Sequence, residues 1–193
     1  DIRTMGGEAC FHRTDVSKAD DVKSMVERAV KEFGALHVAV NNAAVSPDTH
    51  VIWELDEAEL DRVFAVDLKG VALCLKYETA EMMRQNIKGS IVNIASCSAF
   101  RPQPKNSAYV AAKHGAVGLV KTLALEGAAD GIRAVALCPG FVRTPLVERQ
   151  IAAHRHRLEP TRVPHERERG ELNDVTDLGR ADLDRLVALA VIE

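Results

Sequence analysis

The sequence has few cysteines and no long apolar run, and its charges nearly balance. Its 193 residues include four cysteines, none in a Cys-x-x-Cys pair, which favours reduced thiols in a cytoplasmic protein over a disulfide framework. No apolar run approaches the ~20 residues of a membrane span, and the N-terminal segment lacks the apolar core of a signal peptide. The net charge of −3 gives no electrostatic reason to expect nucleic acid or an anionic membrane as a partner.

What is present is the composition of a globular α/β domain. Apolar residues make up 47% of the chain and charged residues 27%, which is ordinary for such proteins. The segments with the apolar pattern of strands are 11–16, 35–40, 89–96 and 131–140. The segments with helical periodicity are 17–34, with Ser17 as a possible N-cap, then 56–85 and 107–128. This alternation predicts βαβ units and a parallel sheet covered by helices on both faces.

One helical segment carries a tyrosine and a lysine four residues apart, Tyr109 and Lys113, which makes them neighbours on the helix surface. A free phenol has a pKa near ~10, and a nearby ammonium group lowers it by stabilising the phenolate. The pair could therefore exchange a proton near neutral pH, although this spacing alone is also typical of an exposed helix pair. Ser96 favours catalysis, because it ends a predicted strand, where open parallel sheets face their ligand crevice.

An ordered set of motifs resembles the short-chain dehydrogenase/reductase family over residues 6–148. The matching motifs are "DV" at 15–16, "NNAA" at 41–44, "VDLKG" at 66–70, "GSIVNIAS" at 89–96, "YVAAK" at 109–113 and "CPGFVRTP" at 138–145. The resemblance implies an α/β fold with a Rossmann-like, doubly wound parallel sheet. It also implies interconversion of a secondary alcohol and a ketone with NAD or NADP as cofactor.

The resemblance assigns roles to individual residues. Tyr109 would exchange the proton with the substrate oxygen, Lys113 would tune Tyr109 and bind the nicotinamide ribose, and Ser96 would hold the substrate oxygen. The adenine would lie near the first two of the cofactor-binding residues, and the nicotinamide near the last four. The implied cofactor-binding residues are Asp15, Val16, Asn42, Ala43, Tyr109, Lys113, Pro139, Gly140, Val142 and Thr144.

The sequence departs from the family at Asp67, where the family usually has an asparagine that supports a water-mediated proton relay to the lysine. An ionised aspartate only accepts hydrogen bonds. Its charge would favour the protonated lysine but raise the pKa of the tyrosine. We therefore count Asp67 among the catalytic residues and expect slower turnover than with asparagine. The alternative is that Asp67 merely caps a helical turn.

No G-x-x-x-G-x-G loop, the family's pyrophosphate-binding segment, precedes Asp15. We therefore expect a partial fold that lacks the first two strands and the last strand of the family. The strand at 11–16 would then lose its neighbour, and the strand at 35–40 would be a bare edge. The expected domains are a partial Rossmann-like domain at 1–148, an Arg/His-rich loop or disordered segment at 149–175 replacing the substrate lid, and a C-terminal helix at 176–193.

The resemblance also implies partners. These are a small alcohol or carbonyl substrate and a second copy of the chain, in a homodimer or homotetramer formed through the helices at 56–85 and 107–128. We expect no nucleic acid, membrane or metal partner. A second interpretation is a catalytically inactive fragment that acts only in subunit association. A third takes the stretch containing His154, His156 and His165 as a nucleic-acid or metal site, but its interleaved glutamates favour a solvated loop.

Overall fold

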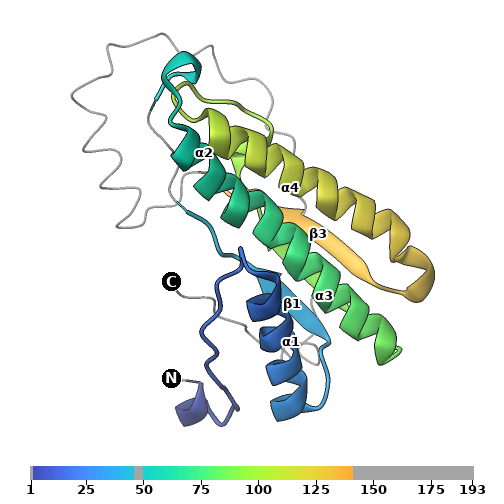
Figure 1. Ribbon diagram of the computed structural model, residues 1–193. Helices are drawn as coiled ribbons and strands as arrows, with labels where there is room; N and C mark the ends of the chain where they lie inside the picture. The colour runs from blue at the N-terminus through green and yellow to red at the C-terminus, as the bar shows by residue number, and fades with distance from the viewer. Residues whose placement is uncertain (1, 46–49, 141–193) are drawn as a thin grey trace. The chain divides into compact units, whose positions relative to one another are not determined.

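The computed structural model describes residues 2–45 and 50–140. The expectations for 149–175, for 176–193 and for Val142 and Thr144 lie outside these residues. In chain order (Figure 1), the elements are η1 (Arg3–Met5), α1 (Ala19–Phe33), β1 (Val38–Asn41), η2 (Ile52–Glu54), α2 (Glu57–Val63), η3 (Phe64–Gly70), α3 (Val71–Arg84), β2 (Ser90–Ile94), η4 (Cys97–Ala99), α4 (Ser107–Glu126), η5 (Ala128–Asp130) and β3 (Arg133–Leu137).

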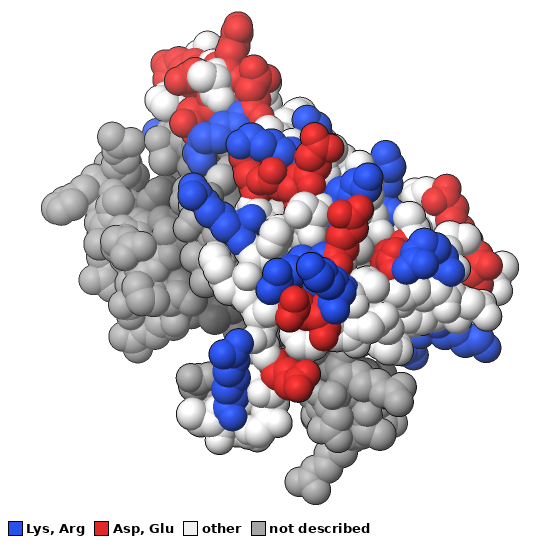
Figure 2. All heavy atoms as spheres, turned by 60° about the horizontal axis from the view of Figure 1, so that its bottom comes forward, with Lys and Arg blue, Asp and Glu red and all other residues white. Residues whose placement is uncertain are grey.

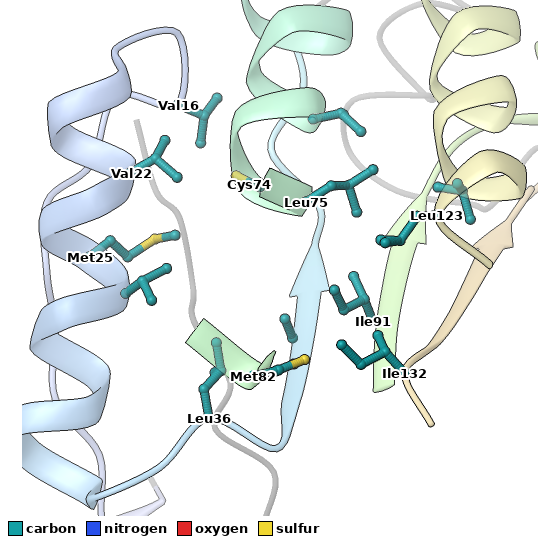
Figure 3. Packing of buried hydrophobic residues seen from close by; sticks show 14 of the residues in the cluster. Val16, Val22, Met25, Leu36, Cys74, Leu75, Met82, Ile91, Leu123 and Ile132 are labelled. Carbon is teal, nitrogen blue, oxygen red and sulfur yellow. The ribbon is translucent and has the colours of Figure 1, made fainter. Parts of the chain in front are cut away.

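The described strands form one parallel sheet in the order β1-β2-β3. Ala39, Ile91 and Ala134 are register partners and share one face of this sheet. That face packs against apolar residues of α1, α3 and α4 in the main core, and Figure 3 shows Met25, Leu75 and Leu123 converging there. The predicted parallel α/β arrangement is confirmed.

The opposite face of the sheet is more open. Val135 and Leu137, which alternate with the buried side of β3, are 55% and 49% exposed. The helices of the described residues cover one face, so the second helical layer expected from the sequence is not among the elements described. As expected, β1 is an edge strand of the described sheet, since it pairs only with β2 there.

The segment 11–16, which the sequence predicts as a strand, forms no strand in the structure. The physical reason is that a strand needs a neighbour for its backbone hydrogen bonds, and β1 pairs with β2 alone among the described strands. The segment still packs, because Val16 is buried in the main core. Gly70 makes this possible, since a Cβ there would lie 2.8 Å from Val16 Cγ2.

Helix α1 begins differently from the prediction. Its N-cap is Lys18, which makes no side-chain cap. Ser17 instead donates from its backbone N–H and its hydroxyl to Asp15 Oδ1, at 3.0 and 2.6 Å. Asp20 and Asp21 in the first turn favour the positive end of the helix, and the helix ends at Gly34 with φ of 83°.

The helical segment predicted at 56–85 consists of three pieces rather than one. Asp56 caps α2 by accepting from the N–H of Ala58 at 2.9 Å. The chain then widens into a π-helical stretch, η3, before α3 continues. Such stretches often mark functional sites, and this one carries Asp67.

The solvent faces of the helices carry charges of both signs, which are interspersed on the face shown in Figure 2. Several are paired one turn apart, as in Arg28–Glu32 at 3.1 Å and Arg84–Glu81 at 2.6 Å. Such exposed pairs contribute little to stability. Among the residues described, no helix has the length and apolar character needed to cross a bilayer.

Candidate active site

Small residues on α4 let this helix approach the rest of the domain closely. Ala108 and Ala112 are buried against Val45 and Val63 in a cluster that includes Tyr109. This packing brings the tyrosine to Ser96, which follows β2 and begins η4 by accepting from the N–H of Ser98 at 3.1 Å. A hydroxyl and a phenol therefore meet beyond the carboxyl end of the central strand.

Tyr109 and Lys113 project together from α4, as their spacing predicts. The Lys113 Nζ lies 5.3 Å from the centroid of the Tyr109 ring, and the lysine is only 1% exposed. Burial of a lysine is costly unless its charge is paired. The paired group is Asp67, whose Oδ2 lies 3.4 Å from Lys113 Nζ.

Asp67 is fully buried and uses its two oxygens differently. Its Oδ1 accepts from the backbone N–H of Val45 at 2.9 Å, and its Oδ2 makes the ion pair with Lys113. That 3.4 Å distance is longer than the N–O distance of a good charge-assisted hydrogen bond. The contact is therefore an ion pair with poor hydrogen-bond geometry. In agreement, Oδ2 has no hydrogen-bond partner among the described residues. Asp67 therefore does more than cap a turn.

Burial raises the pKa of Asp67, while Lys113 and the Val45 N–H act in the opposite direction. Burial also raises the pKa of Tyr109; its hydrogen bond with Ser96 lowers it, and the charge of Asp67 raises it further. The direction of the Asp67 effect on the Tyr109 pKa agrees with the prediction from the sequence. The expected net lowering of the Tyr109 pKa is wrong for this structure, because burial and the charge of Asp67 both disfavour the phenolate.

Four of the residues predicted to bind the cofactor line a cleft of about 910 Å³. They are Asp15 and Val16, predicted to lie near the adenine, and Asn42 and Ala43. Asp15 is held by Ser17 and by Lys18, whose Nζ lies 3.0 Å from Asp15 Oδ2, and these bonds lower the pKa of Asp15. The lining of the cleft thus combines carboxylates with apolar and cationic side chains.

The end of β3 lies beside the site as the parallel topology predicts. The Pro139 carbonyl accepts from the N–H of Cys97 at 2.9 Å, which places Pro139 next to the residue that follows Ser96. Gly140 follows it and is exposed. The structure thus brings together Ser96, Tyr109, Lys113 and Asp67.

Reasoning from the sequence missed Glu78. It is 1% exposed and accepts a hydrogen bond from Asn41 Nδ2 at 3.0 Å. Burial raises its pKa to about 7, against the lowering effect of Asn41. The sequence pattern could have indicated that Glu78 is buried, because it falls in the apolar stripe of α3 that contains Cys74, Leu75 and Met82.

A parallel sheet with helices, and with polar side chains gathered beyond its carboxyl ends, defines a Rossmann-like α/β protein. The family model for short chain dehydrogenase matches residues 1–155. The chain therefore belongs to the short-chain dehydrogenase/reductase family, and the resemblance found in its motifs is confirmed.

Relatives with known names agree. The chain is 48% identical over 141 residues to a short chain dehydrogenase/reductase of Aspergillus oryzae. This match covers 73% of this chain and 54% of that protein. It is 38% identical over 160 residues to a cyclohexanol dehydrogenase of Acinetobacter, covering 83% and 63%. The chain thus spans little more than half the length of the curated relatives it matches.

Solved structures show the same fold. ElxO with NADP bound has a TM-score of 0.70 and 30% identity, covering 76% of this chain and 58% of that one. Levodione reductase has a TM-score of 0.69 and 36% identity, covering 72% and 53%.

Proposed function

We propose that this chain carries the catalytic residues of an NAD(P)-dependent oxidoreductase that interconverts a secondary alcohol and a ketone. The observation that carries this proposal is the cluster of a buried lysine, a phenol and a hydroxyl beyond the carboxyl end of β2. A relative named cyclohexanol dehydrogenase and a solved structure of a levodione reductase support the reaction class.

In this proposal Tyr109 gives a proton to, or takes one from, the substrate oxygen. Ser96, which hydrogen-bonds Tyr109, donates to the same oxygen and holds it in place for proton transfer. The positive charge of Lys113, 5.3 Å from the centre of the phenol ring, stabilises the phenolate. Asp67 pairs with the buried lysine at 3.4 Å.

The residues present fit a nicotinamide dinucleotide. The cleft combines apolar side chains, Val16 and Ala43 among them, with the carboxylate of Asp15, which suits a planar base that bears an amino group. Pro139 and Gly140 would border the nicotinamide, and we extend this assignment to Val142 and Thr144. The bound nicotinamide supplies or accepts the hydride, and the protein supplies position and electrostatics.

Replacing the tyrosine tests this function. We expect Tyr109→Phe to lower kcat for oxidation of a secondary alcohol about 100-fold or more while cofactor binding persists. The assay follows NADH or NADPH formation across a panel of secondary alcohols, with cofactor affinity measured separately. Tyr77→Phe is the matched control, because Tyr77 is the other tyrosine of the chain and packs on the main core. A Tyr109→Phe variant as active as the wild type would refute the assignment.

A second candidate function, subunit association without catalysis, has its own observation. Leu125 on α4 is 82% exposed and Met83 on α3 is 51% exposed, and both lie on the segments expected to form a homodimer or homotetramer. Large apolar side chains on neighbouring helices suit an interface.

For this association we expect Leu125→Glu to shift the chain toward monomer in sedimentation velocity experiments. Met5→Glu, at a residue that is 86% exposed outside these helices, should leave the distribution unchanged. If both variants sediment like the wild type, α4 does not form the interface.

A further inference from the structure

Two buried carboxyl groups hold the two ends of one short loop, residues 42–44. At its start, Asn41 donates from Nδ2 to Glu78 Oε2 on α3 at 3.0 Å. At its end, the backbone N–H of Val45 donates to Asp67 Oδ1 on η3 at 2.9 Å. Glu78 and Asp67 are 1% and 0% exposed, so both carboxyl groups are shielded from water. Hydrogen bonds to a carboxyl group are stronger in such an interior than in water.

The loop between these anchors is part of the wall of the large cleft. Asn42 and Ala43 line that cleft. They also line a much smaller hollow together with Asn41, Gly70 and Cys74, so the loop is backed by the helical segment that carries both carboxyl groups. Any shift of Asn41 therefore moves residues that face the cleft.

Packing alone does not require a carboxyl group at position 78. Its neighbours one turn away, Cys74 and Met82, are apolar and buried. An apolar side chain would fill the position without the free-energy cost of burying a carboxyl group. What such a side chain lacks is an acceptor directed at the amide of Asn41.

The orientation of Asn41 depends on this acceptor. Its register partner across the sheet is Asn93 on β2. Asn93 is fully buried, and its side-chain nitrogen and oxygen have no hydrogen-bond partner among the described residues. Glu78 is thus the side chain that fixes the Asn41 amide.

We propose that Glu78 is a positioning residue for the cofactor cleft: it fixes Asn41 and thereby the loop 42–44 that presents Asn42 and Ala43 to the cofactor. Glu78 touches neither cofactor nor substrate in this proposal. The anchoring of the loop stands on the contacts above, whereas its effect on cofactor affinity rests on the proposed function.

The first experiment measures anchoring on the full chain without cofactor. The reporter is hydrogen exchange of the Val45 backbone amide, which lies at the far end of the loop from Glu78. We expect Glu78→Met, which removes the acceptor, to speed this exchange about tenfold, and Glu78→Gln, which keeps an acceptor oxygen, to leave it near the wild-type rate. Cys74→Ala is the matched control, since it alters packing on the same helix face and leaves the Asn41 bond intact.

Asn41→Ala approaches the same bond from the strand and keeps the test decisive if Glu78→Met does not fold. The two changes remove one interaction, so the double variant should exchange no faster than either single variant. Unchanged Val45 exchange in both single variants, or a Glu78→Gln variant as fast as Glu78→Met, would overturn the anchoring role.

The second experiment measures cofactor affinity and turnover in the same variants. We expect Glu78→Met and Asn41→Ala to weaken NADH or NADPH binding several-fold with kcat at saturating cofactor little changed, and Glu78→Gln to match the wild type. Faster Val45 exchange with unaltered affinity would overturn the link to the cofactor. A wild type that binds neither cofactor would instead refute the proposed function, and the exchange measurement would still decide the anchoring.

Discussion

At Tyr109 three influences oppose loss of the phenolic proton, namely burial, Asp67 and Cys97, and the hydrogen bond with Ser96 favours it. Burial and the negative charge of Asp67 raise the pKa of the phenol, whereas the hydrogen bond with Ser96 lowers it. Asp67 therefore has two opposite effects. Its carboxylate stabilises the buried Lys113, and it also destabilises the Tyr109 phenolate. A neutral amide in its place would keep the contact with Val45 and remove the opposing charge.

This balance predicts the effect of Asp67→Asn. The pKa of Tyr109 should fall. Because alcohol oxidation needs the phenolate, the rise of kcat with pH should then occur at lower pH, and kcat at neutral pH should increase several-fold. The measurement is the pH dependence of kcat. Asp61→Asn, at an exposed acid on α2, controls for net charge. An identical pH profile in Asp67→Asn and the wild type would contradict the prediction.

At the scale of elements, α4 determines where the reacting groups lie. Its buried face includes the alanines Ala108, Ala112 and Ala116, and these small side chains let Tyr109 and Lys113 approach η3 and η4. A larger side chain on that face would push the helix outward. The same residue on the solvent side would meet no resistance.

We therefore expect Ala112→Leu to lower the free energy of unfolding by about 1–3 kcal/mol through overpacking. Alanine and leucine both favour helices, so a difference in helix propensity does not account for the expected loss of stability. Ala111→Leu, at an exposed position one residue away, is the control and should change stability little. Urea unfolding of the two variants makes the comparison, and equal stability would contradict the close packing of this helix.

The elements differ in how far the sequence predicts them. Tyr109, Lys113 and Ser96 could be singled out because their chemistry follows fixed spacing and strand ends, and the parallel pairing of β1, β2 and β3 follows from the alternation of strands with helices. The strand expected at 11–16 failed, because a strand depends on a partner that local sequence does not reveal. Glu78 was missed because its role depends on a contact with Asn41, 37 residues away.

For the molecule as a whole, Glu78 links stability to pH. Its pKa in the folded protein is about 7, against an ordinary value of 4.5. The folded state therefore holds a proton that the unfolded chain releases between these values, and stability falls as pH rises through this range. The difference corresponds to about 3 kcal/mol.

Glu78→Gln removes this dependence while keeping an acceptor for Asn41. We expect the variant to match the wild type near pH 4.5 and to be more stable by up to about 3 kcal/mol above pH 7. Urea unfolding of both proteins over this range tests it, and subtracting the two curves removes the titration of other groups. A difference that does not change with pH would show that Glu78 does not titrate in this range.

The π-helical stretch at Phe64–Gly70 has a consequence for chain length. An α-helix turns by about 100° per residue, so inserting or deleting one residue here, with the winding otherwise unchanged, would rotate everything that follows by roughly that angle. Asp67 and Glu78 could then no longer reach Val45 and Asn41 together. Insertions and deletions should accordingly be tolerated in the surface turns of this protein but not in this segment, whose residue count sets the phase between two anchors.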